Sequence, residues 1–292
     1  MAIRYTNDGT SADPYLRTDF NIGGLSDLPA WSAGPTGDVR SQLQAIKDAG
    51  YAGVQGADAE LCRAVGLAAT TNGRVNAPGE IAPLAAEWKE AGYECATLHV
   101  GWGWESDSQI DALVDDILSV SAAEDLPLYI ETHRATIAQD TYRTVKLVER
   151  RPEIRFNGDF SHWYTGLEMR YGDWEQKLAF LAPVFERVAF MHGRLGNSCC
   201  MQVTLEDPSM ERSVADFREM WTRSMEGFLR NSRPGDYLSF NPEILHPAIN
   251  YARLSKTPEG AWREESDRWL EAHRMTQIAT ECFAEAQARV SD

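Results

Sequence analysis

The chain has 292 residues, a formal net charge of −16 at pH 7, 43% hydrophobic residues and 25% charged residues. This length and composition indicate a globular protein with a large core and exclude a disordered or fibrous chain. The acidity disfavours a nucleic-acid partner, because sequence-independent binding to phosphates depends on Lys and Arg. No apolar run approaches the ~18 residues that a membrane span needs.

The first residues of the chain, 1–8, contain no apolar segment of the kind found in secretory signals. The cysteines are odd in number and scattered, which suits a reducing compartment better than a disulfide framework. They are Cys62, Cys95, Cys199, Cys200 and Cys282. We therefore expect a cytoplasmic protein.

A polar lead is expected over residues 1–16, and short strand-like segments then alternate with helical segments along the chain. The predicted strands are 18–22, 51–55, 67–71, 95–100, 127–131, 154–159, 187–192 and 238–243. The predicted helices are 38–49, 59–65, 78–92, 109–123, 141–149, 173–185, 212–229 and, as the last helix, 264–292.

This strict alternation predicts a parallel sheet. Eight strand–helix units in ~250 residues is the number that forms a (β/α)8 (TIM) barrel. A doubly wound open sheet is the rival, but it usually has fewer strands, and Gly23-Gly24 is not followed by the glycine spacing of a dinucleotide-binding turn. We predict an α/β protein with a single TIM-barrel domain over residues 1–292.

Titratable side chains gather at the C-terminal ends of the predicted strands, where barrel active sites lie. Among the six histidines, only His273 falls within a helix. Glu131, Asp159, His192 and Glu243 end four consecutive strands, so their side chains could converge on one point. Three carboxylates and one imidazole suit Mn²⁺, Mg²⁺ or Co²⁺, and Zn²⁺ remains open. Each residue alone is explained as well by a helix cap or an Arg partner, but the four together predict a shared metal site.

The motifs at these strand ends resemble those of the xylose isomerase-like superfamily of sugar isomerases and epimerases. That superfamily includes the tagatose and psicose 3-epimerases, hydroxypyruvate isomerase and inosose dehydratase. The matching segments are Ile130-Glu131-Thr132-His133, Gly158-Asp159-Phe160-Ser161-His162, Phe190-Met191-His192 and Pro242-Glu243. They cover the second half of the barrel, whereas the first half matches only in its alternation of strands and helices.

The resemblance implies one divalent metal ion with Glu131, Asp159, His192 and Glu243 as its ligands. It also implies that His162 and Arg194 bind substrate. His99 and His133 are further candidates for contacts with peripheral hydroxyl groups, although an ordinary histidine at the rim explains each of them equally well.

Such a site supports isomerisation or epimerisation of a sugar or keto-sugar. A divalent cation that binds two neighbouring oxygens of a hydroxy-ketone stabilises the enediolate formed when the α-proton is lost. Glu131 and Glu243 would act as base and acid on either side of that carbon. If proton removal is followed by loss of a β-substituent, the same site is a lyase or dehydratase acting on a keto-sugar, keto-glycoside or keto-inositol.

Two departures from the family pattern leave the substrate open. Gln55 stands where many members have Glu, and Gly193-Arg194-Leu195 follows the predicted metal-binding histidine where many have x-Lys-Asp.

A multi-zinc apurinic endonuclease is a remote alternative, but residues 193–212 lack the Asp-x-His pair of that class. A non-catalytic barrel is a third hypothesis, which the complete ligand set argues against. We expect a small carbohydrate as the partner, with neither nucleic acid nor membrane, and the resemblance makes a homo-oligomer plausible.

Overall fold

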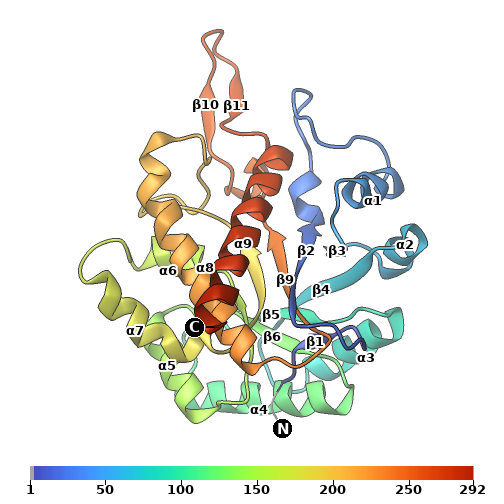
Figure 1. Cartoon of the computed structure of the whole chain (residues 1–292), viewed down its shortest axis with the longest axis vertical. Coiled ribbons are helices and arrows are strands. Elements are labelled where there is room, and N and C mark those ends of the chain that lie inside the picture. The colour runs from blue at the N-terminus through green and yellow to red at the C-terminus, as the bar shows by residue number, and fades with distance from the viewer. Residues whose placement is uncertain (1–2, 292) are drawn as a thin grey trace.

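Eight parallel strands close into a barrel in the computed structural model of the protein, which describes residues 3–291 (Figure 1). The barrel strands are β2 (Tyr15–Asn21), β3 (Gly53–Gln55), β4 (Ala68–Val75), β5 (Ala96–Val100), β6 (Leu128–Glu131), β7 (Phe156–Gly158), β8 (Val188–Gly193) and β9 (Asp236–Pro242). The ring closes because β9 pairs in parallel with both β8 and β2. The predicted (β/α)8 barrel is confirmed.

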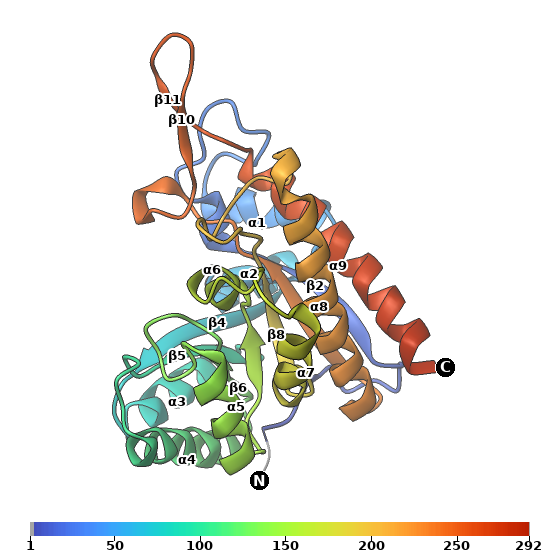
Figure 2. The same ribbon diagram turned by 90° about the vertical axis from the view of Figure 1, so that its left-hand side faces the viewer.

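One long helix follows each barrel strand, and these helices surround the barrel (Figures 1 and 2). They are α1 (Val39–Asp48), α2 (Ala59–Val65), α3 (Ile81–Ala91), α4 (Asp107–Ala123), α5 (Thr141–Arg150), α7 (Trp174–Phe185), α8 (Glu211–Asn231) and α9 (Arg268–Ser291). The shorter elements are α6 (Ser161–Gly166) and the 3-10 helices Ile22–Leu25, Pro208–Met210 and Pro247–Ile249. None of the helices in the described part of the chain has the length and hydrophobicity to cross a membrane.

The helix ends follow the capping residues in the sequence. The side chains of Asp38, Asp58 and Asp173 accept backbone N–H groups in the first turns of α1, α2 and α7. Gly66 and Gly92 end α2 and α3 with φ of 78° and 89°, a left-handed conformation that glycine adopts without steric cost. These local signals fix where each helix stops and the next strand begins.

The barrel interior near the N-terminal ends of the strands contains a buried ion pair. Nη2 of Arg17 lies 2.7 Å from Oδ2 of Asp19, and Nη1 of Arg17 lies 2.6 Å from Oε2 of Glu94. The guanidinium also lies over the ring of Tyr237, 4.0 Å from its centroid. A Cβ atom at Gly53 would come within 2.6 Å of Oδ1 of Asp19, so this strand needs glycine beside the pair.

The predicted polar lead over residues 1–16 is wrong within the described residues. Residues Thr6–Asn7 form strand β1, which pairs antiparallel with the start of β9. Ile3 and Tyr5 are buried in the main core, and β2 already begins at Tyr15. The apolar side chains of Ile3 and Tyr5, although they stand among polar residues in the sequence, thus cover the N-terminal end of the barrel.

The predicted last helix, 264–292, begins too early; its final residue lies outside the described residues. Strands β10 (Leu254–Lys256) and β11 (Trp262–Glu264) form an antiparallel hairpin that projects from one end of the molecule (Figures 1 and 2). Helix α9 starts only at Arg268, where Oδ1 of Asp267 accepts the backbone N–H of Trp269 at 3.0 Å. The acidic cap therefore sets the start of the helix.

Candidate active site

The C-terminal ends of β6, β7, β8 and β9 bring Glu131, Asp159, His192 and Glu243 together. Nδ1 of His192 lies 3.5 Å from Oε2 of Glu131 and 3.4 Å from Oε2 of Glu243. Asp159 offers a carboxylate oxygen within 4.8 Å of ligand atoms of both His192 and Glu243. These distances follow from the parallel pairing of adjacent strands, which aligns their ends at one rim. The role of the four side chains as ligands stays a prediction.

Arg194 enters the same cluster from the residue after β8. Its side chain is buried, and Nη2 lies 3.1 Å from Oδ2 of Asp159 and also hydrogen-bonds the carboxylate of Glu243. The guanidinium packs on the ring of Tyr251, 4.2 Å from its centroid. A fixed positive charge therefore faces the predicted ligand set from the barrel rim.

The electrostatics of the cluster favour ionised carboxylates. Burial disfavours the charged form of Glu131, but the imidazoles of His192 and His99 outweigh burial and hold the pKa of Glu131 well below its usual range. Burial likewise opposes ionisation of Asp159, and Arg194 and His162 lower its pKa below the ordinary value. Around His192, burial lowers the pKa, whereas the carboxylates of Glu243 and Glu131 raise it, with a result of about 9.

Amide side chains from neighbouring strands hydrogen-bond to the cluster and fix its orientation. Nε2 of His192 lies 2.7 Å from Oε1 of Gln55, which leaves Nδ1 as the ring nitrogen that faces the carboxylates. Asn157 donates to Oε2 of Glu131 at 3.0 Å, and Asn21 donates to Oε1 of Glu243 at 3.2 Å. Such outer contacts fix the orientation of metal-binding side chains in proteins.

Three imidazoles stand in a row beside the cluster. The ring centroids of His99 and His133 are 4.1 Å apart, and those of His133 and His162 are 3.8 Å apart. Burial and the neighbouring His162 lower the pKa of His133 to about 3, so this ring is neutral. His162 is buried, and neither of its ring nitrogens makes a hydrogen bond to a described residue. All eight side chains that the sequence singled out thus lie in one site.

Sequence reasoning missed Asn21, Asn157 and Tyr251 as parts of this site. Asn157 lies in β7, and Asp159 follows two residues later, directly after the strand, so period-two alternation was a signal that both face the interior. Asn21 is the register partner of Gln55 on the neighbouring strand. Tyr251 had no such signal, because its position depends on the long segment between β9 and the hairpin.

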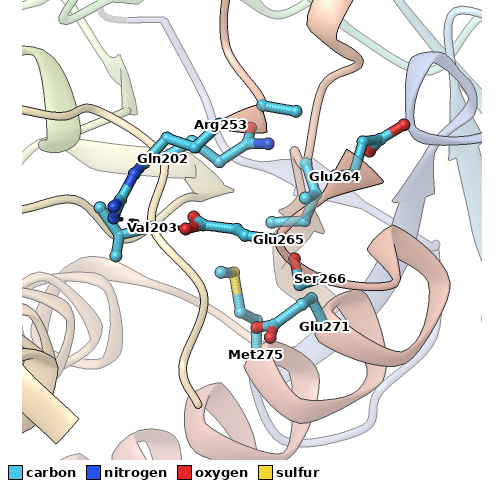
Figure 3. A pocket seen from close by; sticks show the side chains of 10 residues that line it. Gln202, Val203, Arg253, Glu264, Glu265, Ser266, Glu271 and Met275 are labelled. Atoms are coloured by element: carbon cyan, nitrogen blue, oxygen red, sulfur yellow. Dashed lines mark ion pairs between the residues drawn. The ribbon is translucent and has the colours of Figure 1, made fainter. Parts of the chain in front are cut away.

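A pocket at the base of the hairpin is lined by none of the predicted site residues. Figure 3 shows Arg253 and Glu265 on one side of it and Glu271 and Met275 of α9 on the other. Nη1 of Arg253 lies 3.3 Å from Oε2 of Glu265, and Oε1 of Glu271 accepts the hydroxyl of Thr204 at 2.6 Å. These contacts tie the hairpin, the β8–α8 segment and α9 together, which is a structural role.

Comparison with known proteins identifies the fold. No family model and no curated protein sequence matches the chain. Among solved structures, a D-tagatose 3-epimerase-like protein aligns with a TM-score of 0.56 and 10% identity over 94% of this chain and 100% of its own. A xylose isomerase-like TIM barrel protein from Mycobacterium smegmatis in complex with magnesium aligns with a TM-score of 0.52 and 11% identity, over 96% of this chain and 100% of its own.

The probable 3-DHS dehydratase AsbF from Bacillus anthracis aligns with a TM-score of 0.50 and 11% identity, over 81% of this chain and 96% of its own. The chain has the xylose isomerase-like TIM-barrel fold. At these identities the likeness shows the fold, and the chemistry has to be argued from the site itself.

The residues of this xylose isomerase-like barrel fit a divalent cation. Glu131 and Asp159 are almost completely buried, and burying several carboxylates together is costly unless cations or hydrogen bonds compensate them. The buried Oδ1 of Asn157 and Nδ1 of His162 lack hydrogen-bond partners among the described residues, so the site holds unused polar atoms. Oxygen-rich donors with one imidazole match the preferences of Mn²⁺ and Mg²⁺.

Proposed function

We propose that the protein is a divalent-metal-dependent isomerase or epimerase that acts on a sugar or keto-sugar. The observation that carries the proposal is the convergence of Glu131, Asp159 and Glu243 on Nδ1 of His192 at the C-terminal rim of the barrel. The proposal agrees with the names of the solved structures that share the fold, among them a D-tagatose 3-epimerase-like protein and a barrel in complex with magnesium.

Glu131, Asp159, Glu243 and Nδ1 of His192 would hold the cation, with Mn²⁺ or Mg²⁺ favoured over Co²⁺ and Zn²⁺. When bound, a divalent ion supplies Lewis-acid polarisation of a carbonyl and its neighbouring hydroxyl group. The net charge of −16 supports a small carbohydrate rather than a nucleic acid as the ligand.

The two glutamates are the acid and base of the proposal. Glu131 ends β6 and Glu243 follows β9, and these two strands lie on opposite sides of β8 in the barrel wall. The two carboxylates therefore approach His192, on β8, from opposite sides. Hydrogen bonds from Asn157 and Asn21 hold Oε2 of Glu131 and Oε1 of Glu243. Oε1 of Glu131 is then available to take or return a proton, whereas Oε2 of Glu243 also bonds Arg194 and would do so when that contact opens.

Arg194 and His162 would bind the oxygen on which negative charge develops. The guanidinium is fixed by Asp159, Glu243 and the ring of Tyr251, so it is already oriented before substrate arrives. Nε2 of His162 lies 3.4 Å from Oδ2 of Asp159, which leaves Nδ1 as the nitrogen that would meet a substrate oxygen.

A lyase or dehydratase is the second candidate. His133, two residues after Glu131, lies against His162 at the same rim, where it would contact a departing hydroxyl group. The likeness of the fold to the probable 3-DHS dehydratase AsbF agrees with this alternative.

Metal analysis of the purified protein tests the proposal. We expect wild-type protein loaded with Mn²⁺ to retain an ion through dialysis that His192→Ala loses. Candidate keto-sugars incubated with the enzyme in deuterated water should then gain deuterium at the carbon next to the carbonyl. Deuterium gain with the carbon skeleton and its oxygens intact supports an epimerase, whereas loss of water supports a dehydratase. Absence of a retained ion in both proteins contradicts the proposal.

A further inference from the structure

Glu243 lies outside the barrel strand that carries it. Strand β9 ends one residue before it, whereas Glu131 and His192 lie within β6 and β8. Asp159 also follows its strand, but the backbone N–H and the hydroxyl group of Ser161 both donate to its Oδ1, at 3.1 and 2.6 Å. The backbone around Glu243 therefore needs contacts of its own to keep the carboxylate at the site.

The chain after β8 supplies such contacts at two points. The N–H of Glu243 donates to the carbonyl oxygen of Gly193 at 2.9 Å, which continues the parallel pairing of β8 with β9 by one residue. Two residues further on, the side-chain amide of Gln202 bonds both backbone groups of Leu245. Oε1 of the amide accepts the N–H at 2.8 Å, and Nε2 donates to the carbonyl oxygen at 2.9 Å.

The side chain of Gln202 takes the place of a backbone peptide group. Strand β8 ends at Gly193, so its ladder with β9 stops there. A side-chain amide has the same kinds of donor and acceptor as a peptide group, and that of Gln202 is buried. It therefore continues the ladder past the ends of the two strands, and Glu243 lies between two points at which the backbone is held.

The opposite side of the segment after β9 is in contact with the residues after β2. A Cβ atom at Gly23 would come within 3.2 Å of Cδ2 of Leu245 and within 3.0 Å of Oδ1 of Asn21. The amide nitrogen of Asn21 in turn donates to Glu243. The segment is therefore enclosed on both sides, by Gln202 through hydrogen bonds and by Gly23 through close packing.

The loop that carries Gln202 is itself anchored directly after this residue. The N–H of Val203 donates to the carbonyl oxygen of Leu195 at 3.0 Å. The N–H of Thr204 donates to Oε1 of Glu265 at 3.0 Å. The amide of Gln202 therefore extends from a fixed backbone, as a residue that positions another must.

We propose that Gln202 is a positioning residue for Glu243. By fixing the backbone two residues after Glu243, it keeps the carboxylate 3.4 Å from Nδ1 of His192, where the proposed function uses it as a ligand and as an acid–base group. The inference rests on the proposed function, because only there does Glu243 have a chemical role. Contacts that orient ligating side chains are typically worth about 10- to 100-fold in metal affinity or activity.

The affinity for Mn²⁺, measured by isothermal titration, tests the proposal without a substrate. Gln202→Met keeps the length of the side chain and removes both hydrogen bonds, so we expect about a tenfold loss of affinity. Thr204→Val is the matched control, because it removes the hydroxyl group bonded to Glu271 from the same loop and leaves both bonds to Leu245. We expect both variants to lower the midpoint of urea unfolding, but only Gln202→Met to lower the affinity.

A double-mutant cycle shows whether Gln202 acts through Glu243. In Glu243→Gln, which removes the carboxylate, Gln202→Met should change the affinity for Mn²⁺ by less than about twofold. A loss by the same factor with and without the Glu243 carboxylate would reject the positioning role.

Gln202→Asn provides a second variant if circular dichroism shows that Gln202→Met does not fold. It has the same amide on a side chain one methylene shorter, which cannot reach both backbone groups of Leu245, so we expect a comparable loss of affinity. If the folded variants bind Mn²⁺ as tightly as wild type, the positioning role is rejected and the proposed function stands. If wild type itself does not bind Mn²⁺, the proposed function fails and the positioning role with it.

Discussion

Gln55 and His192 share a short hydrogen bond inside the barrel, with Nε2 of the imidazole 2.7 Å from Oε1 of the amide. Gln55 is fully buried, and its own Nε2 donates to Thr97 at 3.0 Å. A flipped amide would place an N–H donor against Nε2 of His192 and lose that contact. The amide thereby selects which ring nitrogen of His192 faces the carboxylates.

Gln55→Met should weaken metal binding, because it removes the group that orients His192. We expect a loss of affinity of tenfold to about 100-fold, the usual effect of removing such a contact. The buried N–H of His192 would also lack an acceptor, which costs about 1–3 kcal/mol of unfolding free energy. Isothermal titration with Mn²⁺ and urea unfolding measure the two effects. Gln55→Glu keeps the acceptor and serves as the control; equal affinity in Gln55→Met and wild type would contradict this role.

The stability of the metal-free protein should fall as pH rises from neutral to alkaline. The carboxylates of Glu243 and Glu131 raise the pKa of His192 from 6.5 to about 9 in the folded state. The protonated ring therefore contributes stability that is fully present below pH 6.5 and is lost as the pH passes about 9. The contribution is at most about 3 kcal/mol. Urea unfolding in the presence of a chelator should show this loss in wild type and a flatter profile in His192→Gln; parallel profiles would contradict the assignment.

Glu131→Gln and Glu243→Gln should each abolish turnover and leave the fold intact. The amide has the shape of the carboxylate but cannot take up a proton, and general acid–base catalysis contributes about 10²- to 10⁴-fold to the rate. Circular dichroism and turnover of the substrate found by the deuterium screen provide the measurements. Glu149→Gln, at an exposed position on α5, is the control. Turnover at the wild-type rate in either site variant would reject the acid–base roles.

Arg17→Met should destabilise the barrel by about 3–5 kcal/mol, because it leaves the fully buried carboxylate of Asp19 without its partner. Asp19→Asn in the same chain should recover part of that loss, since it removes the buried uncompensated charge and leaves only the partly exposed Glu94 without its partner. Urea unfolding of the two single variants and the double variant completes the thermodynamic cycle. Strictly additive effects would show that the two side chains do not interact.

The fold was predictable because its signals are local. Periodic apolar positions, acidic N-caps such as Asp38 and Asp173, and C-terminal glycines such as Gly66 mark the ends of each unit, and the count of units leads to the barrel. The pairing of Thr6 with Tyr237 was not predictable, because it joins distant parts of the chain. The hairpin is local, but its strands have three mostly exposed residues each and show no apolar alternation.

The site was predictable to the extent that it follows from strand ends. Glu131 and His192 are the last or nearly the last residues of their strands, so a coarse assignment was enough to place them at one rim. The stacking of His133 on His162 and the packing of Arg194 on Tyr251 depend on side-chain rotamers and on a long loop. The amino-acid sequence alone predicts neither of these two contacts.

The strand that closes the barrel is also the last of the eight barrel strands that a ribosome would make. β9 fills the gap between β8 and β2, two strands from opposite ends of the chain, and Glu243 follows it directly. A nascent chain that lacks this strand has an open sheet edge at β2 and an incomplete ligand set. If the proposed ligands are correct, an ion can be held by all four of them only after Glu243 has been made, so metal binding would follow barrel closure and would not guide the early steps of folding.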